Sequence, residues 1–596
     1  MGCLFGYMGA PAPDLLDRMA DRLRHRCARG SERVRIDIRD GKTVEIGHGV
    51  APWAVGAQVA ERPERKAAWG WNGVLFSPNG LPASETAQRQ LDALIDAPEA
   101  GLERLDGAFC AALALGDRLH LVRDAAGVKA IYWTRTRNRL LFASEIKALF
   151  ADPDVPRRMR PGALPEYLTF SFVPGEGTLM EGIFELQPGT RLFWNGNGDP
   201  ALHRHFVPES LEPSDSNGRP AGEYAAELRQ NLERATADCC AAGTGPPAVF
   251  VSGGIDSSAV LALAARRYPE DRLRTYSIHF GPKYVNENDF VRMITDQYHT
   301  RHTWLDIRPK RFLHRMREII WRLDDPIGDP ITVPNFLMAE AASRDGARVL
   351  NGEGGDPCFG GPKNIPMMLA RIYRPDNGMA ESDYLAREYL RSYHKCYADL
   401  ERLLNPDFFR GAGGIPALAG LISPFFEEEP PRRFLNRLMS INIRRKGANL
   451  ILVKVDKMTA ANGLLALPPL FARRVVAASM AIPPGLKLAG NVEKGVLKRA
   501  VADIVPRPIV ERPKSGMMVP VRFWMQKEMR RFARRVLSRR NLNRLGYFDP
   551  AYVQRLLAYD REAVAGARHG LKLWMLVTFV LWHEMMVEGR EEQAGY

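Results

Sequence analysis

Residues 249–258 contain an apolar strand, two glycines and the start of a helical pattern in immediate succession. Glycines let the backbone approach a ligand closely, and the free N–H groups of a first helical turn form an anion site. Asp256 lies in the middle of this turn and would repel a bare phosphate. A divalent metal between carboxylate and phosphate removes the conflict, because Mg²⁺ prefers oxygen ligands. The stretch therefore predicts a site for the pyrophosphate end of a nucleotide with its metal.

The same stretch admits two other interpretations. An ordinary strand, turn and helix with a capping Ser or Asp is one of them. A Walker A loop is excluded, because the Gly-Lys-Ser/Thr ending is absent. The string SGGIDSS at 252–258 resembles the PP-loop of enzymes that cleave ATP to AMP and pyrophosphate. The resemblance implies ATP and Mg²⁺, with nucleotide contacts from Phe250, Val251, Ser252, Gly253, Gly254, Asp256, Ser257, Ser258, Ile278, Asn351, Gly352 and Lys494.

The bulk composition limits the class of protein. A chain of 596 residues with 45% hydrophobic and 26% charged residues can form two or more globular domains. A net charge of +14 is compatible with nucleic acid, an anionic membrane surface or acidic substrates. In residues 530–544, arginine pairs recur at helical spacing with apolar residues between them, typical of the solvated face of an amphipathic helix. Nucleic acid is therefore the less favoured partner, and a substrate-docking face stays open.

The cysteines and the apolar runs indicate the cellular compartment of the protein. The seven cysteines form no Cys-x-x-Cys pair and are odd in number, which favours a reducing cytoplasm over a disulfide frame or a structural zinc site. No basic segment followed by a long apolar core opens the chain. The apolar run at 571–586 is short for a membrane span and contains Lys572, His583 and Glu584. We expect a buried helix there, no membrane span and a cytoplasmic protein.

Residues 1–207 contain short strands separated by Gly and Asp-Gly turns, as in a layered β-rich domain. Several strings in this region are similar, in order and spacing, to the glutaminase half of class B asparagine synthetases. They are MGCLFG at 1–6, LRHR at 23–26, NG at 72–73, RLDGAF at 104–109, RD at 123–124 with Gly127 and Lys129, and FASEIKAL at 142–149. The resemblance implies an Ntn-hydrolase-like αββα glutaminase-type domain.

Three departures from the family pattern concern its glutaminase chemistry. In the family a cysteine directly follows the initiator Met, so that the freed α-amine is its base. Here Gly2 holds that position, and the nitrogen of Cys3 would stay in a peptide bond. The family's His-Arg carboxylate clamp reads His48-Gly49, and its Asn-Gly-Glu ends in Val74. We expect an inactive domain, retained as a scaffold that packs against the synthetase half.

Residues 208–222 are polar and rich in Pro, Ser and Gly, which predicts a linker. Beyond it, in residues 223–596, strands alternate with helices, as in a doubly wound parallel sheet whose ligands bind at the carboxyl ends of its strands. The resemblance implies an adenine nucleotide α-hydrolase-like (PP-loop) synthetase domain, so the chain as a whole is expected to be α/β.

Residues 351–361, NGEGGDPCFGG, follow an expected strand and resemble the family's second glycine-rich site loop. A Mg-pyrophosphate site at this edge needs a second carboxylate, so Asp356 is assigned as the metal partner of Asp256. A turn with a solvated Asp is the alternative. By family analogy Glu353 is the base for the attacking amine, with a purely structural acid as the other possibility.

The remaining family-like strings lie further along the chain. Asp324, Asp325 and Asp329 resemble the family's Asp-Glu-Pro and Asp-Pro turns, and we expect them behind the site. LVKVDKM at 452–458 resembles a site-lining helix, in which Lys454 and Asp456 could also form internal salt bridges. Residues 464–470, LLALPPL, lack the acid and the arginine of the family's acceptor-pocket segment, which argues against free aspartate as the substrate.

RPKSGMMVP at 512–520 resembles the family's Arg-Pro-Lys loop. Adenylation and amide formation both develop negative charge, first on the α-phosphate and then on the tetrahedral oxygen. One fixed cation stabilises both states, and Lys514 is therefore the catalytic candidate. An exposed lysine without a role is the alternative.

Together these features predict an ATP-dependent, AMP-forming amide-bond synthetase. With the glutaminase disabled, the amine should belong to the substrate, so that the product is a ring. In the family, β-lactam synthetases and the macrolactam cyclases of lasso peptides form such rings. The cyclases are favoured by the basic net charge and by the absence of the acid and the arginine from the acceptor-pocket segment at 464–470. The resemblance implies a precursor peptide as substrate, and a leader-peptide protease and a leader-binding protein as partners. An ammonia-dependent asparagine synthetase and a nucleotide-binding scaffold stay open.

Overall fold

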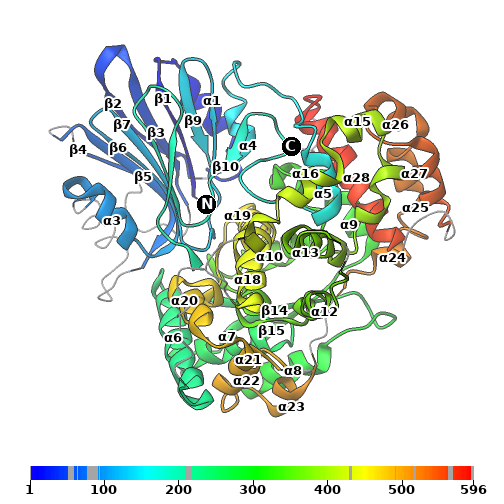
Figure 1. Cartoon of the computed structure of the whole chain (residues 1–596). Coiled ribbons are helices and arrows are strands. Elements are labelled where there is room, and N and C mark those ends of the chain that lie inside the picture. Colours follow the sequence, from blue (N-terminus) through cyan, green and yellow to red (C-terminus); the bar gives the residue numbers. More distant parts are fainter. Residues whose placement is uncertain are drawn as a thin grey trace.

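The computed structural model describes residues 2–27, 29–51, 59–62, 65–76, 92, 94–208, 218–376, 378–427, 433–489, 492–513, 518–560 and 568–591. Figure 1 shows two sheet-containing regions and a group of helices beside them. The N-terminal sheets lie at the upper left, the parallel sheet with α6 and α7 lies below them, and α24–α28 lie at the right.

The N-terminal region contains two six-stranded antiparallel sheets. The first has the order β10-β8-β9-β1-β3-β2 and the second the order β12-β11-β7-β6-β5-β4. Alternate residues of β1 and β9, such as Leu4, Met8 and Phe142, pack between the sheets, as period-two alternation requires. The strands are β1 (Cys3–Gly9), β2 (Ser31–Asp37), β3 (Thr43–Gly49), β4 (Val59–Arg62), β5 (Ala67–Leu75), β6 (Gly107–Leu115), β7 (Arg118–Arg123), β8 (Tyr132–Arg135), β9 (Arg139–Ala143), β10 (Ile183–Glu185), β11 (Thr190–Trp194) and β12 (Ala201–Arg204).

Helices accompany these sheets as an αββα arrangement requires. α1 (Leu15–Arg22) and α4 (Ile146–Leu149) pack together beside β1 and β9, and α3 (Pro98–Arg104) lies beside the second sheet (Figure 1). α5 (Ala163–Phe170) leaves the sheets and packs against α28 (His569–Met586), where the Tyr167 hydroxyl donates to the Met575 carbonyl at 3.0 Å. The Ntn-like layering expected from the sequence is therefore present.

The C-terminal sheet is parallel throughout, in the order β15-β14-β13-β16-β17. Its strands are β13 (Ala248–Phe250), β14 (Arg274–His279), β15 (Arg301–Asp306), β16 (Arg348–Leu350) and β17 (Leu465–Leu467). Phe250 packs into the core that contains α9, α10 and α19, whereas Val249 packs into the core that contains α6 and α7. Helices therefore cover both faces, which confirms the doubly wound sheet.

The first helices of this region include α6 (Ala221–Ala241), which begins inside the segment that the sequence predicted as a linker. Residues 209–217 of that segment lie outside the described residues. The helices around the sheet are α7 (Ile255–Arg267), α8 (Asn288–Gln297), α9 (Pro309–Leu323), α10 (Thr332–Ala342), α11 (Gly355–Phe359), α18 (Phe434–Ile441), η6 (Asn442–Leu452), α19 (Val453–Ala460), α20 (Arg473–Ala481), α21 (Pro484–Lys487), α22 (Gly495–Ala500) and α23 (Arg507–Glu511).

A group of helices continues from the sheet. It comprises η4 (Pro362–Asn364), α12 (Ile365–Ile372), α13 (Glu381–Ser392), η5 (Tyr397–Asp399), α14 (Leu400–Leu403), α15 (Pro406–Gly411), α16 (Gly414–Gly420), α17 (Pro424–Glu427), α24 (Val521–Trp524), α25 (Arg530–Val536), α26 (Arg539–Leu545), α27 (Pro550–Leu557) and α28. The arginine-rich stretch forms two short helices, α25 and α26, with Ala533 and Val536 buried. α28 is buried along its length, as expected for residues 571–586. Among the described residues, no helix is long and apolar enough to cross a membrane.

Candidate active site

The turn between β13 and α7 is built as an anion cradle. Gly253 adopts φ +72, a left-handed conformation that favours glycine, and α7 begins at Ile255 after it. The Ser252 N–H donates to the Ser257 hydroxyl at 3.1 Å, and the two hydroxyl oxygens lie 3.1 Å apart. The side chain of Ser258 is buried in the same first turn. The serines therefore fix the loop so that the N-terminal N–H groups of α7 face the strand end.

The second acidic loop lies against this turn because of the strand order. β13 stands between β14 and β16, so its carboxyl end is the switch point where ligands bind in such sheets. A Cβ on Gly352 would lie 2.4 Å from the Ser257 nitrogen, and a Cβ on Gly355 would lie 2.0 Å from the Asp256 Oδ1. Only glycine permits this approach, which brings Asp356 in α11 beside Asp256.

Lys494 joins the two acids. Its Nζ lies 2.5 Å from the Asp256 Oδ2 and 2.6 Å from the Asp356 Oδ1. The lysine side chain is 1% exposed and precedes α22 with φ +55, an unusual backbone for a non-glycine residue. The sequence assigned Lys494 only as a phosphate contact, and its central place between the carboxylates follows from the fold. Two carboxylates held this closely repel each other unless a cation lies between them.

The donor set at this point fits Mg²⁺. Asp256 and Asp356 offer carboxylate oxygens from two loops, and the described residues contain no cluster of three or more His, Cys, Asp or Glu side chains that could form a closed metal cage. Mg²⁺ commonly takes one or two carboxylates together with substrate phosphates and water. A phosphate is therefore needed to complete such a site.

A cavity of about 270 Å³ opens at these strand ends. Ten of the predicted site residues line it: Phe250, Val251, Ser252, Asp256, Ser257, Ile278, Asn351, Gly352, Glu353 and Asp356. Gly253, Gly254, Ser258 and Lys494 lie behind or beside this wall, in contact with its loops. The Glu353 N–H donates to the Asn351 Oδ1 at 3.1 Å, and Glu353 is half-buried in the cavity wall.

The Lys514 loop is described only at its ends. Residues 514–517 lie outside the described residues, so the structural position of Lys514 stays a prediction. Arg512 holds the start of the loop beside the anion cradle. Its Nη2 lies 2.5 Å from the Glu287 Oε1, its guanidinium stacks 4.0 Å from the centre of the Phe290 ring, and a Cβ on Gly254 would lie 4.0 Å from the Nη2. The loop therefore starts at the cradle.

The opposite wall of the cavity contains residues that sequence reasoning missed. α10, η6 and α19 contribute Asn335, Met338, Lys446, Ile451 and Thr459. α18, η6 and α19 form one continuous helical run, in which η6 has π-helical hydrogen bonding, a rare form that often occurs at functional sites. The 452–458 string had indicated a site-lining helix, and its Val455 lies in the wall. Nothing in the spacing of 442–452 indicated that Lys446 also faces the cavity.

The acids before α10 hold the two regions together. Asp324 accepts hydrogen bonds from the N–H groups of Ile146 and Lys147 and pairs with Lys457 at 3.2 Å. Asp325 accepts from the Leu179 N–H at 3.2 Å. These two residues therefore fix the N-terminal region. Asp329 differs, because it pairs with Lys454 at 2.9 Å, and the pKa of its carboxyl is lowered to about 2 chiefly by that lysine, against the effect of burial.

The glutaminase pocket is closed around the N-terminus. A Cβ on Gly2 would lie 2.5 Å from the Asn72 Oδ1, so the family's cysteine does not fit at position 2 in this arrangement. A Cβ on Gly49 would lie 2.5 Å from both the Cys3 and the Cys27 sulfur, so sulfur fills the place of the family's arginine clamp. Burial raises the pKa of the Cys3 thiol, which keeps it protonated and a poor nucleophile. All seven cysteines are free thiols.

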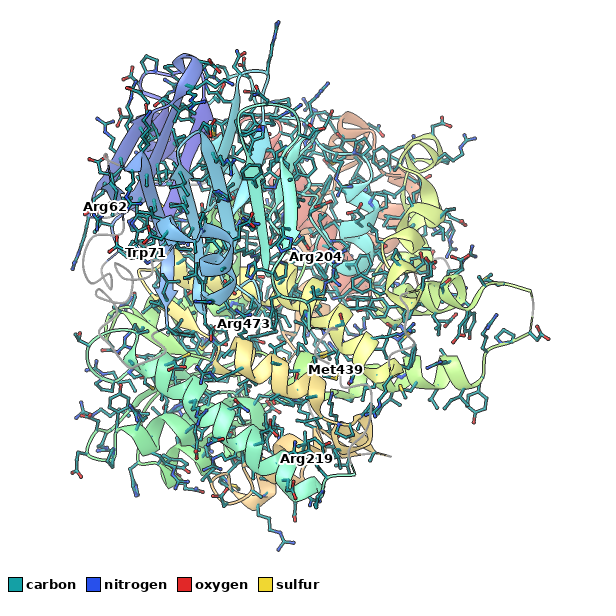
Figure 2. The ribbon with its side chains drawn as sticks, turned by 60° about the vertical axis from the view of Figure 1, so that its left-hand side comes forward. Arg62, Trp71, Arg204, Arg219, Met439 and Arg473 are labelled. Atoms are coloured by element: carbon teal, nitrogen blue, oxygen red, sulfur yellow. The ribbon has the colours of Figure 1, made fainter. Side chains whose placement is uncertain are left out.

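Buried charges join this region to the helices of the cavity wall. Asp456 on α19 pairs with Lys129 and, at 3.3 Å, with Arg26, whose other nitrogen lies 3.2 Å from Glu145. The Gly175 N–H donates to the Asn449 Oδ1 of η6 at 3.0 Å. Figure 2 shows Arg473 between the N-terminal sheets and the helices below them, where it donates to the Leu105 carbonyl at 3.3 Å. The N-terminal region therefore positions η6 and α19.

Comparison with known proteins agrees with this arrangement. The family described as asparagine synthase matches residues 227–584, and the family described as glutamine amidotransferase domain matches residues 89–206. The chain belongs to the asparagine synthase family. It is an asparagine synthetase-like, ATP-dependent carbon–nitrogen ligase.

Three relatives show the range of the family. The glutamine-hydrolyzing asparagine synthetase 1 of Bacillus subtilis is 27% identical over 497 residues, which cover 79% of this chain and 76% of that one. A putative glutamine-hydrolyzing asparagine synthetase of Mycobacterium tuberculosis is 30% identical over 526 residues, 82% of this chain and 78% of that one. The carboxyethyl-arginine beta-lactam-synthase of Streptomyces clavuligerus is 30% identical over 260 residues, 43% and 47% of the two chains.

Proposed function

We propose that this family member adenylates a side-chain carboxylate of a peptide and closes a macrolactam ring with an amine of the same peptide, as in lasso peptide biosynthesis. One observation carries the proposal: the nucleophile position of the glutaminase is Gly2, packed against Asn72, while the acids of the ATP site are in place. An enzyme that keeps the activating half and lacks the ammonia-releasing half must take its amine from elsewhere.

The first step is attack of the substrate carboxylate on the α-phosphorus of ATP, with loss of pyrophosphate. Asp256 and Asp356 would hold Mg²⁺, which would neutralise charge on the leaving pyrophosphate. The buried Lys494 ammonium, which pairs with both carboxylates, would contact phosphate oxygens when the nucleotide and its metal are bound. Lys514, entering from a loop anchored at the cradle by Arg512, would stabilise the charge that develops on the α-phosphate.

The second step is attack of the amine on the acyl adenylate, with AMP as the leaving group. Glu353 lines the cavity beside Asp356 and would accept the proton that the amine loses. The new bond is an amide, and the net change in the peptide is loss of one water. A substrate that carries both carboxylate and amine makes this step intramolecular, which removes the entropy cost of a second reactant.

Two other enzymatic functions fit the same site. The similarity to a beta-lactam-synthase favours a smaller ring closed on a small substrate. The similarity to asparagine synthetases, which are named as glutamine-hydrolyzing, favours asparagine formation, and Gly2 at the nucleophile position would make free ammonia the nitrogen source here. A nucleotide-binding scaffold without turnover is the non-enzymatic possibility. The macrolactam is preferred because residues 464–470 lack the charges expected of an aspartate pocket and because the net charge of +14 suits an acidic peptide.

The proposal assigns partners and a location. The substrate is a precursor peptide, and a leader-peptide protease and a leader-binding protein would deliver it without its leader. All would act in the cytoplasm, because the seven thiols are free and a reducing environment keeps them so.

The test is direct. The full chain is incubated with Mg-ATP and a leaderless candidate peptide, and AMP and the peptide mass are measured. We expect AMP and a peptide lighter by one water, and no AMP from the Lys514→Ala variant. Formation of asparagine from aspartate and ammonia would contradict the cyclase, and absence of AMP with every carboxylate tried would favour the scaffold.

A further inference from the structure

Five cations from distant segments converge beside the cavity. We call them the cationic cluster: Lys363 of η4, Lys395 of the turn after α13, Lys446 of η6, Lys454 of α19 and Arg568 before α28. Lys446 lines the cavity itself. Lys363, Lys395 and Arg568 do not line the cavity, so the cluster extends beyond its wall.

The cluster holds more positive charge than its neighbours neutralise. Lys454 pairs with Asp329 at 2.9 Å, whereas Asp356 is shared with Lys494. In the part of the chain that the structure describes, no carboxylate forms an ion pair with Lys363, Lys395 or Lys446. Burial and the neighbouring charge of Lys363, opposed by the charge of Asp356, lower the pKa of Lys446 to about 7. Burial and the charge of Lys363, opposed by Asp329, lower the pKa of Lys395 to about 8.

Such an arrangement is unfavourable until an anion enters it. Lys395 and Lys446 are half-buried, whereas Lys363 and Arg568 are exposed. The two half-buried ammonium groups lose hydration without gaining a carboxylate partner, and a bound anion restores the balance. The π-helical stretch that carries Lys446 is itself a rare form found at functional sites. Charge and backbone therefore both point to a ligand.

The cluster differs in position from the groups that would hold the pyrophosphate of ATP, although Lys446 also interacts with Asp356. The pyrophosphate has its own cation, Lys494, and its own metal-binding carboxylates at the α7 cradle. Lys395 follows α13 and Arg568 precedes α28, and neither segment contributes to the cradle (α13 and α28 in Figure 1). A nucleotide that is held at the cradle leaves the cluster to the other substrate.

We propose that the cationic cluster binds a carboxylate of the acceptor substrate, a second one beside the carboxylate that is adenylated. The proposal rests on the proposed function, in that it assumes an acidic peptide as substrate. Lys446 and Lys395 determine specificity, because they select a substrate with a fixed negative charge at a set place outside the adenylation site. Neither residue takes part in the bond changes.

Calorimetry on the full chain tests this without turnover. The probe is a tetra-aspartate peptide, titrated in the presence of saturating Mg²⁺ and a non-hydrolysable ATP analogue with a methylene between the α- and β-phosphates. We expect binding by the unmodified protein, about tenfold weaker binding by Lys395→Gln and by Lys446→Gln, and recovery in Lys395→Arg. The matched control is Lys310→Gln, an exposed lysine outside the cluster, which should bind as the unmodified protein does.

The outcomes separate the possible anions and the two proposals. Equal binding in Lys395→Gln and the unmodified protein would overturn the inference, as would equal binding of a tetra-asparagine peptide or no binding of the probe at all. Binding of the probe only when the ATP analogue is left out would assign the cluster to polyphosphate and overturn the carboxylate. If calorimetry gives the expected pattern and no substrate yields AMP, the cluster stands and the synthetase proposal falls. Macrolactam formation with an unchanged KM for the peptide in Lys395→Gln and Lys446→Gln would support the synthetase proposal and overturn the inference about the cluster.

Discussion

The pockets of the two regions differ in the functional groups that they contain. In the synthetase region, Lys494 lies within ion-pair distance of both Asp256 and Asp356, and two glycines let the acidic loops approach each other. In the N-terminal region, glycine stands at position 2, and the sulfurs of Cys3 and Cys27 fill the space beside Gly49. One pocket is arranged for charged ligands, and the other is closed by its own side chains.

The contacts between the regions explain why the closed one persists. Arg26, Glu145, Lys129 and Asp456 form buried ion pairs that fix α19, and Asn449 fixes η6 through Gly175. Both helical segments form the cavity wall. A region without its own chemistry can thus be necessary to the site of another, since it sets the position of that wall.

The largest expected effect is on the metal-binding acids. Asp256→Asn removes a carboxylate charge and leaves a side chain of the same shape, so AMP formation should fall by about 100-fold or more, because charge on the leaving pyrophosphate is no longer neutralised. AMP release under single-turnover conditions measures this. Asp271→Asn, an exposed acid after α7, is the control and should retain full activity. Normal AMP release by Asp256→Asn would contradict a role of Asp256 in neutralising the pyrophosphate.

The interface is expected to respond nearly as strongly, in stability. Arg26→Met leaves Glu145 and Asp456 buried with fewer partners, and the free energy of unfolding should drop by about 3–5 kcal/mol. Denaturant unfolding measures it, and AMP formation should fall as α19 shifts. Arg33→Met breaks an ion pair whose side chains are 65% and 67% exposed, and should cost less than about 1 kcal/mol. Similar costs for the two variants would show that the regions are only loosely joined.

A pH effect of intermediate size is expected at the cationic cluster. Burial and the charges of Lys363 and Arg568, against the opposing charge of Asp329, set the pKa of Lys395 at about 8. Below this pH the ammonium is charged and holds a carboxylate. As the pH rises through about 8 the proton is lost, so affinity for tetra-aspartate should weaken. Titrations across this range check the direction, and the slope should flatten in Lys395→Arg. Affinity that rises with pH would be inconsistent with a lysine-held anion.

The smallest expected effect is at Cys3, the thiol next to the glutaminase nucleophile position. Cys3→Ala should leave AMP formation unchanged, with or without glutamine, because the buried thiol lies 3.2 Å from the Cys27 sulfur and its raised pKa keeps it protonated. Initial rates with saturating peptide measure it, and Cys110→Ala, another buried thiol of the same region, is the comparison. Glutamine-dependent activity that is lost in Cys3→Ala would show that the glutaminase domain is active.

Much of this arrangement could be predicted from local strings. The SGGIDSS turn, the acidic loop at 351–356 and the alternation of strands and helices each have a local physical cause, so the cradle and the doubly wound sheet followed from them. The shared contact of Lys494 could not, since it depends on α22 folding back more than 230 residues after Asp256. Lys446 and Lys395 were missed for the same reason: burial and charge at the cavity come from segments that meet only in the folded chain.

The source of the amine tests the central claim most directly. The protein is incubated with Mg-ATP, the acidic peptide and glutamine that carries ¹⁵N in its amide, with ¹⁵N-ammonium in a parallel reaction, and the peptide product is analysed by mass spectrometry. We predict AMP, a peptide lighter by one water and no ¹⁵N in the product of either reaction. Incorporation of ¹⁵N from glutamine would contradict a closed glutaminase pocket, and incorporation from ammonium would contradict ring closure by the substrate's own amine.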